Sequence, residues 1–212
     1  MAQPLNLDFT HLVALAAALG WASGLRLYAV VFLTGAAGAL GWLPLPAGLQ
    51  VLQNPWVLGA SFVMFALEFF ADKIPGLDTL WDAVHTFIRI PAGAALAAAA
   101  FGAFGADHTA WTAIAALLGG TLAATAHAAK ATARAAANTS PEPFSNIALS
   151  LAGDVAVPTL LWLATAHPWV FFPVLALSVV AAITLIVVLF KFLRALLRRL
   201  SRRTAAVEVL DV

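Results

Sequence analysis

Long stretches without any charged residue divide this chain into segments that are suited to a membrane. These stretches are residues 27–67, 90–106, 109–129 and 155–190. A membrane-spanning helix needs about 20 mostly apolar residues, so the first and last stretches are long enough for two. A proline-rich turn at residues 43–48 and the pair His167-Pro168 divide them. The pattern therefore predicts six spans, at about 9–36, 55–73, 79–105, 109–135, 145–166 and 168–192.

Composition supports the same class of protein. Hydrophobic residues make up 63% of the 212 residues and charged residues 10%, against about 45–50% and 25% in soluble domains. A soluble fold of this size could not bury so much apolar surface. We expect an all-α, polytopic membrane helix bundle, with one domain at residues 1–192 and a basic amphipathic tail at 193–212. The absence of cysteine excludes thiol chemistry, and a net charge of +1 gives no attraction to nucleic acid.

The distribution of Lys and Arg predicts the orientation. Residues 191–203 contain six of them, which places the C-terminus in the cytoplasm by the positive-inside rule. An even number of spans then puts the N-terminus on the same side. The expected outer connections, at about 37–54, 106–108 and 166–168, contain neither Lys nor Arg. The tail itself is expected to anchor the last span, or to bind anionic lipid headgroups.

A polar stripe is expected on the third span. Asp78, Asp82, His85 and Arg89 recur at helical spacing and occupy an arc of about 60°. Four ionisable groups in a line cannot face lipid, so the stripe must face the protein interior or a water-filled vestibule. Glu68 and Asp72 precede it, four residues apart on one face of the second span.

A similar arrangement follows in the second half of the chain. His127, Lys130 and Arg134 share a face of the fourth span, and Asn146, Ser150 and Asp154 share one of the fifth. The linker between them, residues 138–146, contains Glu142. Spans two–three and four–five could therefore be an internal repeat. Arg26 lies deep in the first span and needs a carboxylate partner, for which Glu68 and Asp154 are the candidates.

Several strings resemble a bacterial family of small polytopic inner-membrane proteins that is catalogued only as a domain of unknown function. They are Gly24-Leu-Arg-Leu-Tyr28, Glu68-Phe-Phe-Ala-Asp-Lys-Ile-Pro-Gly-Leu-Asp78, Trp81-Asp82 and Asn138-Thr-Ser-Pro-Glu-Pro-Phe-Ser-Asn146. The resemblance covers residues of about 10 to 190 and implies the bacterial cytoplasmic membrane. It implies no activity and no catalytic residue.

Three functions remain open on these residues. The first is a small transporter or channel-like protein, with a cytoplasm-facing polar cavity for a cation or small charged solute. The second is a non-catalytic structural component with buried ion pairs. The third is a Mg-dependent enzyme acting on a lipid phosphate. A divalent cation, if any, would use Glu68, Asp72, Asp78 and Asp82. Small-residue faces such as Gly20–Gly24 also suggest a homo-oligomer.

Overall fold

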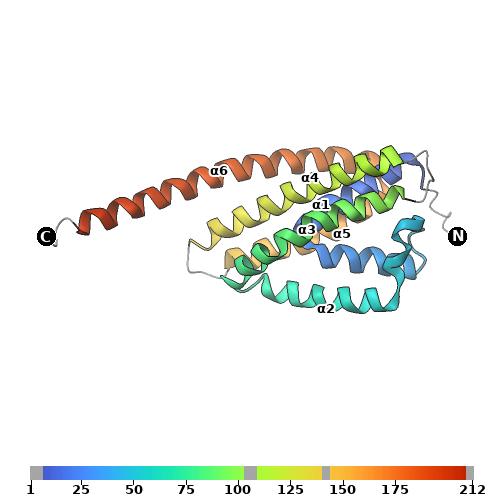
Figure 1. The fold of residues 1–212 in the computed structure, drawn as a ribbon, viewed down its shortest axis with the longest axis horizontal. Helices are drawn as coiled ribbons and strands as arrows, with labels where there is room; N and C mark the ends of the chain where they lie inside the picture. Colours follow the sequence, from blue (N-terminus) through green and yellow to red (C-terminus); the bar gives the residue numbers. More distant parts are fainter. Residues whose placement is uncertain (1–6, 103–108, 140–143, 209–212) are drawn as a thin grey trace.

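The structure is a computed structural model that describes residues 7–102, 109–139 and 144–208. Throughout these residues the chain forms helices and connections without a strand (Figure 1). The helices are α1 (Phe9–Ala39), the short 3-10 helix η1 (Ala47–Gln53), α2 (Pro55–Ala71), α3 (Leu77–Phe101), α4 (Thr109–Ala137), α5 (Phe144–Ala166) and α6 (Pro168–Glu208). The expected all-α bundle is confirmed.

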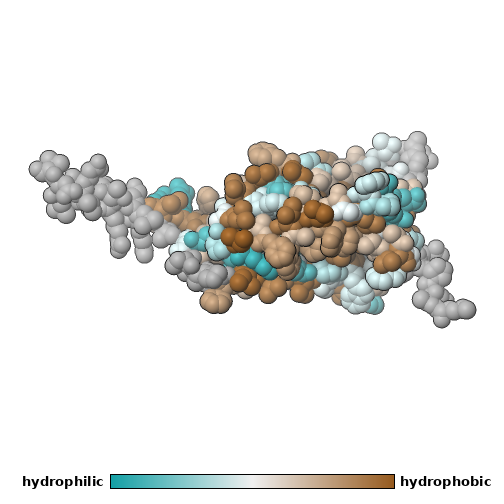
Figure 2. Space-filling model, turned by 90° about the horizontal axis from the view of Figure 1, so that it is seen from below, coloured by the Kyte–Doolittle hydropathy of each residue, from teal (hydrophilic) through white to brown (hydrophobic). Residues whose placement is uncertain are grey.

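Within the described residues, five helices are long and apolar enough to cross a membrane: α1, α3, α4, α5 and the first 28 residues of α6. The pair η1 and α2, bent by 70°, makes a sixth candidate. Large apolar side chains point outward from the bundle on α2, α3, α5 and α6, and apolar residues cover much of the face in Figure 2. A surface of this kind requires lipid around it, so this is a multi-pass membrane protein.

Local sequence explains where two of these helices begin. Asn54 caps α2, because its side-chain oxygen accepts a hydrogen bond from the Trp56 backbone N–H at 2.9 Å, and Pro55 occupies the first helical position. Before α3 the chain turns at Gly76, whose φ of 85° suits glycine. The Asp78 carboxylate then accepts from the backbone N–H groups of Gly76 and Thr79, as expected for a residue at a helix start.

Helix α1 folds back on itself at Arg26, where φ is −149° and ψ is 85°. At its beginning, the ring centroid of Phe9 lies 5.9 Å from that of Phe101. Shortly after its end, Gly48 of η1 packs against the carbonyl of Ala99. Because Ala99 and Phe101 belong to the last turn of α3, both ends of α1 lie at the same end of the bundle (Figure 1). Helix α1 is therefore a helical hairpin with Arg26 at its tip.

The hairpin corrects the expected first crossing at residues 9–36. The apolar length of this segment suits one span, but length carries no information on the direction of the second half. Helices α2 to α6 then run between the two ends of the bundle in alternating directions (Figure 1). As a result, α1 begins at the end opposite to the one from which the C-terminal part of α6 leaves, and the expectation of both termini on one side does not fit this arrangement.

Reporter fusions test the hairpin directly. A reporter fused ahead of residue 1 is expected on the opposite side of the membrane from one fused after residue 212. A reporter inserted at residue 48 should report the same side as the N-terminal fusion, because both ends of α1 lie together. Alkaline phosphatase and green fluorescent protein activity would give the sides. N-terminal and C-terminal reporters on one side would contradict the hairpin.

Glycines allow α1, α3 and α4 to touch backbone to backbone. A Cβ on Gly20 would lie 2.6 Å from the Cα of Gly119, and a Cβ on Gly119 would lie 2.9 Å from the carbonyl oxygen of Gly93. Gly24 likewise packs against the carbonyl of Ala123. These small residues are used for packing within the chain. The homo-oligomer stays a prediction. These glycines already pack within one chain, so they are not available for contact with a second copy.

Replacing Gly119 by Leu is expected to lower the free energy of unfolding by about 1–3 kcal/mol or more, because the added side chain meets the backbone of α3. The matched control is Gly59→Leu, since a Cβ on Gly59 of α2 meets nothing within 4 Å. Thermal unfolding in detergent measures the difference. Equal midpoints for the two variants would show that the three helices can separate without cost.

Candidate functional site

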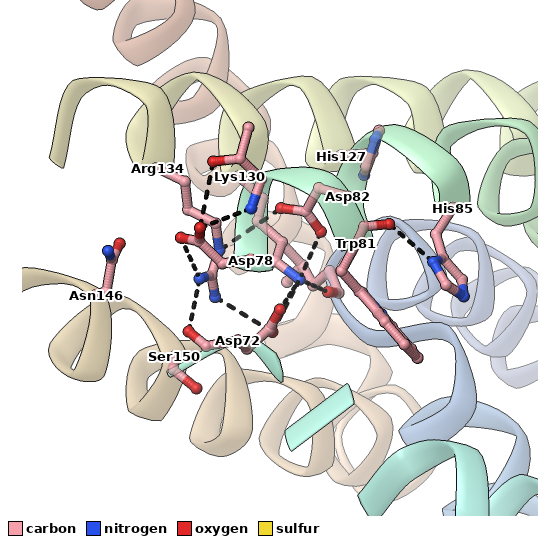
Figure 3. A network of polar contacts seen from close by, with 12 residues as sticks. Asp72, Asp78, Trp81, Asp82, His85, His127, Lys130, Arg134, Asn146 and Ser150 are labelled. Atoms are coloured by element: carbon pink, nitrogen blue, oxygen red, sulfur yellow. Dashed lines mark hydrogen bonds and ion pairs between the residues drawn. The ribbon is translucent and has the colours of Figure 1, made fainter. Parts of the chain in front are cut away.

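Ten charged side chains from α1 to α5 form one connected set of ion pairs among the described residues, which we call the charged network. Figure 3 shows part of it, with Asp72, Asp78, Asp82, Lys130 and Arg134 labelled. Its acidic members are Glu68, Asp72, Asp78, Asp82 and Asp154, and its basic members are Arg26, Lys73, Arg89, Lys130 and Arg134. The five negative and five positive formal charges cancel. Most of these side chains are fully buried, so their pairing is the condition for placing them inside the bundle.

Arg26, at the tip of the α1 hairpin, binds two other helices. Its guanidinium lies 2.8 Å from a carboxylate oxygen of Asp154 and 3.1 Å from one of Asp72. Its Nη2 donates to the backbone carbonyl and to the hydroxyl of Ser150, at 3.0 and 2.7 Å. The expected carboxylate partner is therefore present. Of the two candidates, Asp154 is confirmed and Glu68 is not a partner, whereas Asp72 was missed.

The break in α1 leaves a backbone carbonyl without its helical partner, and Lys130 supplies one. The Nζ of Lys130 donates to the carbonyl oxygen of Leu25 at 3.2 Å. Backbone that leaves the helix at membrane depth needs such partners, because lipid offers none. The ammonium group of Lys130 therefore stabilises the backbone of α1 as well as pairing with carboxylates of the network.

Asp72 lies at the centre of the charged network. Its Oδ2 is 2.9 Å from the Nζ of Lys130, 3.1 Å from Arg26 and 3.2 Å from Arg134. In addition, the backbone carbonyl of Asp72 accepts from the Nη1 of Arg134 at 2.7 Å. Asp72 follows the last residue of α2, so these contacts join the end of α2 to α4 and to the hairpin tip.

The stripe on α3 faces the interior, as its helical spacing predicts. Asp78, Asp82, His85 and Arg89 are all buried. Arg89 pairs with Glu68 of α2, and its Nη1 lies 2.7 Å from Asp82. Asp78 lies 3.0 Å from the Nη1 of Arg134 on α4. The acidic end of α2 and the basic end of α4 thus meet across the stripe.

The two histidines of the site take part in different contacts. His127 accepts from the Nη1 of Arg89 at its Nδ1, at 3.2 Å, so its Nε2–H donates to the hydroxyl of Thr86, at 2.7 Å. This pattern requires a neutral ring. The Nδ1–H of His85 donates to the backbone carbonyl of Trp81, at 2.8 Å, and the two rings stack with their centroids 4.2 Å apart. Thr86 and Trp81 were not among the expected site residues.

Asparagines extend the site to α5. Asn138 donates to the Asp78 carboxylate at 3.1 Å, and Asn146 of α5 donates to the side-chain oxygen of Asn138. Asn146 and Ser150 are buried, so the polar stripe of α5, like that of α3, faces the charged network. Glu142 lies outside the described residues. The internal repeat of spans two–three and four–five stays a prediction.

Lys73, in the turn after α2, was also missed by the sequence reasoning. Its ammonium nitrogen lies 3.4 Å from the Asp154 carboxylate and 3.1 Å from the centroid of the Phe69 ring. Partial burial lowers the pKa of Lys73, and the nearby Asp154 carboxylate opposes this shift. Its position beside Glu68 and Asp72 in the sequence was the signal that could have included it.

Carboxylates of the network face basic groups. Asp72 and Asp82 both contact Lys130 and Arg134, and Glu68 contacts Arg89. Within the described parts of the chain, no three His, Asp or Glu side chains converge as the ligands of a metal ion would. Binding of a divalent cation stays a prediction, and the arrangement of the described side chains offers no set of ligands for it.

A cavity of about 240 Å³ reaches the charged network from between α4 and α5. Its polar lining consists of Arg26, Asp72, Lys130 and Arg134. The remaining lining is apolar and includes Leu149 of α5 and Leu185 of α6, both more than a third exposed. The cavity therefore connects the outer, apolar surface of these helices with the basic side of the network.

Comparisons with known proteins place the chain in a family. No curated protein and no solved structure matches it. The profile of one family, described as a domain of unknown function, DUF4126, matches residues 13–188. This match covers α3, α4 and α5 entirely and α1 from its second turn, so it includes every member of the charged network. The chain belongs to the DUF4126 family.

Proposed function

We propose that this protein is a transporter for a small charged solute in the bacterial cytoplasmic membrane, and that the charged network is its binding and gating region. The observation that supports this most directly is the α1 hairpin, which brings a break in a helix and a buried arginine to the same point. In many secondary transporters, broken helices of this kind form the substrate site within the membrane.

The energetic cost of the network supports a functional role. Ionisable groups inside membranes are expensive, and they mark substrate or ion pathways in many membrane proteins. A buried ion pair adds little net stability compared with apolar residues of the same size. Ten charged side chains are therefore a poor way to hold five helices together, but a suitable way to exchange partners with a charged solute.

In this proposal the structure represents a closed state. Each charged side chain of the network pairs with an opposite charge inside the protein, and a solute would have to replace some of these partners. The cavity between α4 and α5 gives access to Arg26, Lys130 and Arg134, and the hairpin tip is the element that would move. The expected open, cytoplasm-facing cavity would form only after these pairs separate.

Positive charge supports the orientation in the membrane. Lys73, Lys130 and Arg134 lie at the end of the bundle from which the C-terminal part of α6 leaves (Figure 1). By the positive-inside rule this end faces the cytoplasm, and the N-terminal end of α1 faces the other side. Lys191 and Arg194, both exposed on α6, would lie near anionic lipid headgroups.

A structural role is the second candidate, and the balance of charge favours it. Five acidic and five basic groups pair without remainder among the described residues of the network. A set of pairs that only holds the hairpin between α2 and α5 would have this composition. Such a protein would stabilise an assembly in the membrane and carry no solute.

Flux measurements separate the two candidates. The purified chain in proteoliposomes is expected to give a current on a solid-supported membrane when H⁺, Na⁺, inorganic phosphate or acetate is applied. The Arg26→Gln variant should lose this current, because the hairpin tip no longer carries the charge that pairs with Asp72 and Asp154. The Gly59→Leu variant should keep it. If none of these solutes gives a current, the result would favour the structural role over the transporter.

A further inference from the structure

One carboxylate oxygen of the charged network is shared by three basic groups. The Oδ2 of Asp72 lies 2.9 Å from Lys130, 3.1 Å from Arg26 and 3.2 Å from Arg134. Two of these groups come from α4, and the third is at the tip of the α1 hairpin. Three cations around one oxygen are the arrangement in which proteins bind phosphate or carboxylate oxygens of a ligand.

The same three basic side chains line the cavity between α4 and α5, where Asp72 is the only acidic residue among the described lining residues. The rest of this described lining is apolar. Within the cavity wall the basic groups thus outnumber the acidic groups by three to one. An anion entering along this path meets these three basic groups beside apolar surface, while their other partners, Asp78, Asp82 and Asp154, are not among the described lining residues.

The donors at this point already face carboxylates of the network. Both arginines are almost completely buried. The Nη1 of Arg26 lies 3.1 Å from Asp72, its Nε lies 2.8 Å from Asp154, and the Nε of Arg134 lies 3.6 Å from Asp82. Buried N–H groups of this kind need an acceptor. An incoming anion would therefore have to take the place of one of these carboxylates.

We propose that Arg26, Lys130 and Arg134 form a binding site for an anionic phosphate or carboxylate group, and that Asp72 occupies this site in the closed state. An incoming anion displaces the Asp72 carboxylate. Because Asp72 directly follows α2, its release separates the end of α2 from α4 and from the hairpin tip. The transport meaning of this exchange rests on the proposed function, but the binding itself does not.

Two sources could supply such a group. A membrane lipid would place its phosphate among the three basic groups and its acyl chain along the apolar wall, past Leu149 and Leu185. A free phosphate would reach the same groups without using the wall. Both present phosphate oxygens, so the chemistry of recognition is the same and the experiment has to separate the sources.

Asp72→Asn removes the internal anion and is the main test. The full chain is purified in an uncharged detergent, and thermal unfolding is followed with increasing inorganic phosphate, or with micelles containing phosphatidylglycerol. Sodium chloride of equal ionic strength and phosphatidylcholine are the control additions. In the Asp72→Asn variant, half-maximal stabilisation is expected at an anion concentration on the order of tenfold lower than in the unsubstituted chain, because three basic groups have lost a shared partner.

The matched control variant is Asp8→Asn. It makes the same change of carboxylate to amide outside the charged network, at the start of α1, where the Asp8 side chain accepts from the His11 backbone N–H. Its response to phosphate and to phosphatidylglycerol should equal that of the unsubstituted chain. Adding Lys130→Gln to Asp72→Asn should remove the gain. A response of Asp72→Asn no larger than that of Asp8→Asn, for both anions, would overturn the proposal.

Should Asp72→Asn not fold, Lys130→Gln in the otherwise unsubstituted chain takes its place. Phosphate or phosphatidylglycerol must then stabilise the unsubstituted chain more than sodium chloride or phosphatidylcholine does, and the substitution must abolish this difference. Absence of the difference overturns the site. Stabilisation by phosphatidylglycerol alone identifies the lipid as the source, and stabilisation by both identifies the free anion. Binding without current contradicts only the transport function, and current without binding contradicts only this site.

Discussion

Arg26→Gln is expected to lower the free energy of unfolding by about 3–5 kcal/mol, the range found when one partner of a buried ion pair is removed. The substitution leaves Asp154 without its closest cation and removes the guanidinium donor to the carbonyl and hydroxyl of Ser150. It also takes away the side chain that holds the hairpin tip between α2 and α5. Thermal or urea unfolding in detergent, followed by tryptophan fluorescence, would measure the loss.

Arg26→Lys is the conservative comparison for this position. It keeps the positive charge but has one nitrogen in place of a planar guanidinium, so it cannot reach Asp72, Asp154 and Ser150 together. We expect a smaller loss than for Gln, with an intermediate unfolding midpoint. A Gln variant as stable as the unsubstituted protein would mean that the hairpin tip does not depend on its arginine.

The pair of Glu68 and Arg89 should show the second large effect, and a double-mutant cycle isolates it. Both side chains are fully buried, so Arg89→Gln, which leaves Glu68 unpaired, is expected to lower the free energy of unfolding by about 3–5 kcal/mol. Glu68→Gln is expected to cost less, because Arg89 keeps Asp82 as a partner. The double variant removes both charges. It should be less destabilised than the sum of the single variants, by about 0.5–3 kcal/mol.

Asp82 decides how complete this compensation can be. Arg89 also pairs with Asp82, but Asp82 keeps Lys130 and Arg134 as further partners when Arg89 is replaced. The Arg89→Gln variant therefore loses one pair entirely and another in part. Strictly additive losses would show that Glu68 and Arg89 act independently, in contradiction to their contact.

Much of the fold could be predicted from the sequence. The predicted spans at 55–73, 109–135 and 145–166 agree within two residues with α2, α4 and α5. Helix length in a membrane depends on local apolar composition, which the chain itself displays. The burial of Asp78, Asp82, His85 and Arg89 was predictable for a similar reason. Helical spacing places these four ionisable side chains on one face, and exposing that face to lipid is energetically unfavourable.

The partners within the site were less accessible. Charge alone offered Glu68 and Asp154 as partners for Arg26, and it did not identify Asp72 as the carboxylate shared by three basic groups. Lys73 is adjacent to Asp72 in the sequence, which could have included it, whereas nothing in the spacing of Asn138 marks it as a member of the site. Contacts over sequence separations as long as that from Arg26 to Ser150 depend on how the helices cross, and not on any local pattern.

The sequence by itself determined that this is a membrane protein, roughly where its helices begin and end, and which side chains must avoid lipid. These properties follow from the free energy of transferring single segments from water into the membrane, which depends on the composition of each segment. Only the tertiary structure decided that α1 turns back at Arg26. Apolar composition does not distinguish one span from a hairpin, because the hairpin depends on contacts with other parts of the chain. Here Lys130 donates to the Leu25 carbonyl beside the break, and Asp72 and Asp154 pair with the Arg26 guanidinium at the tip.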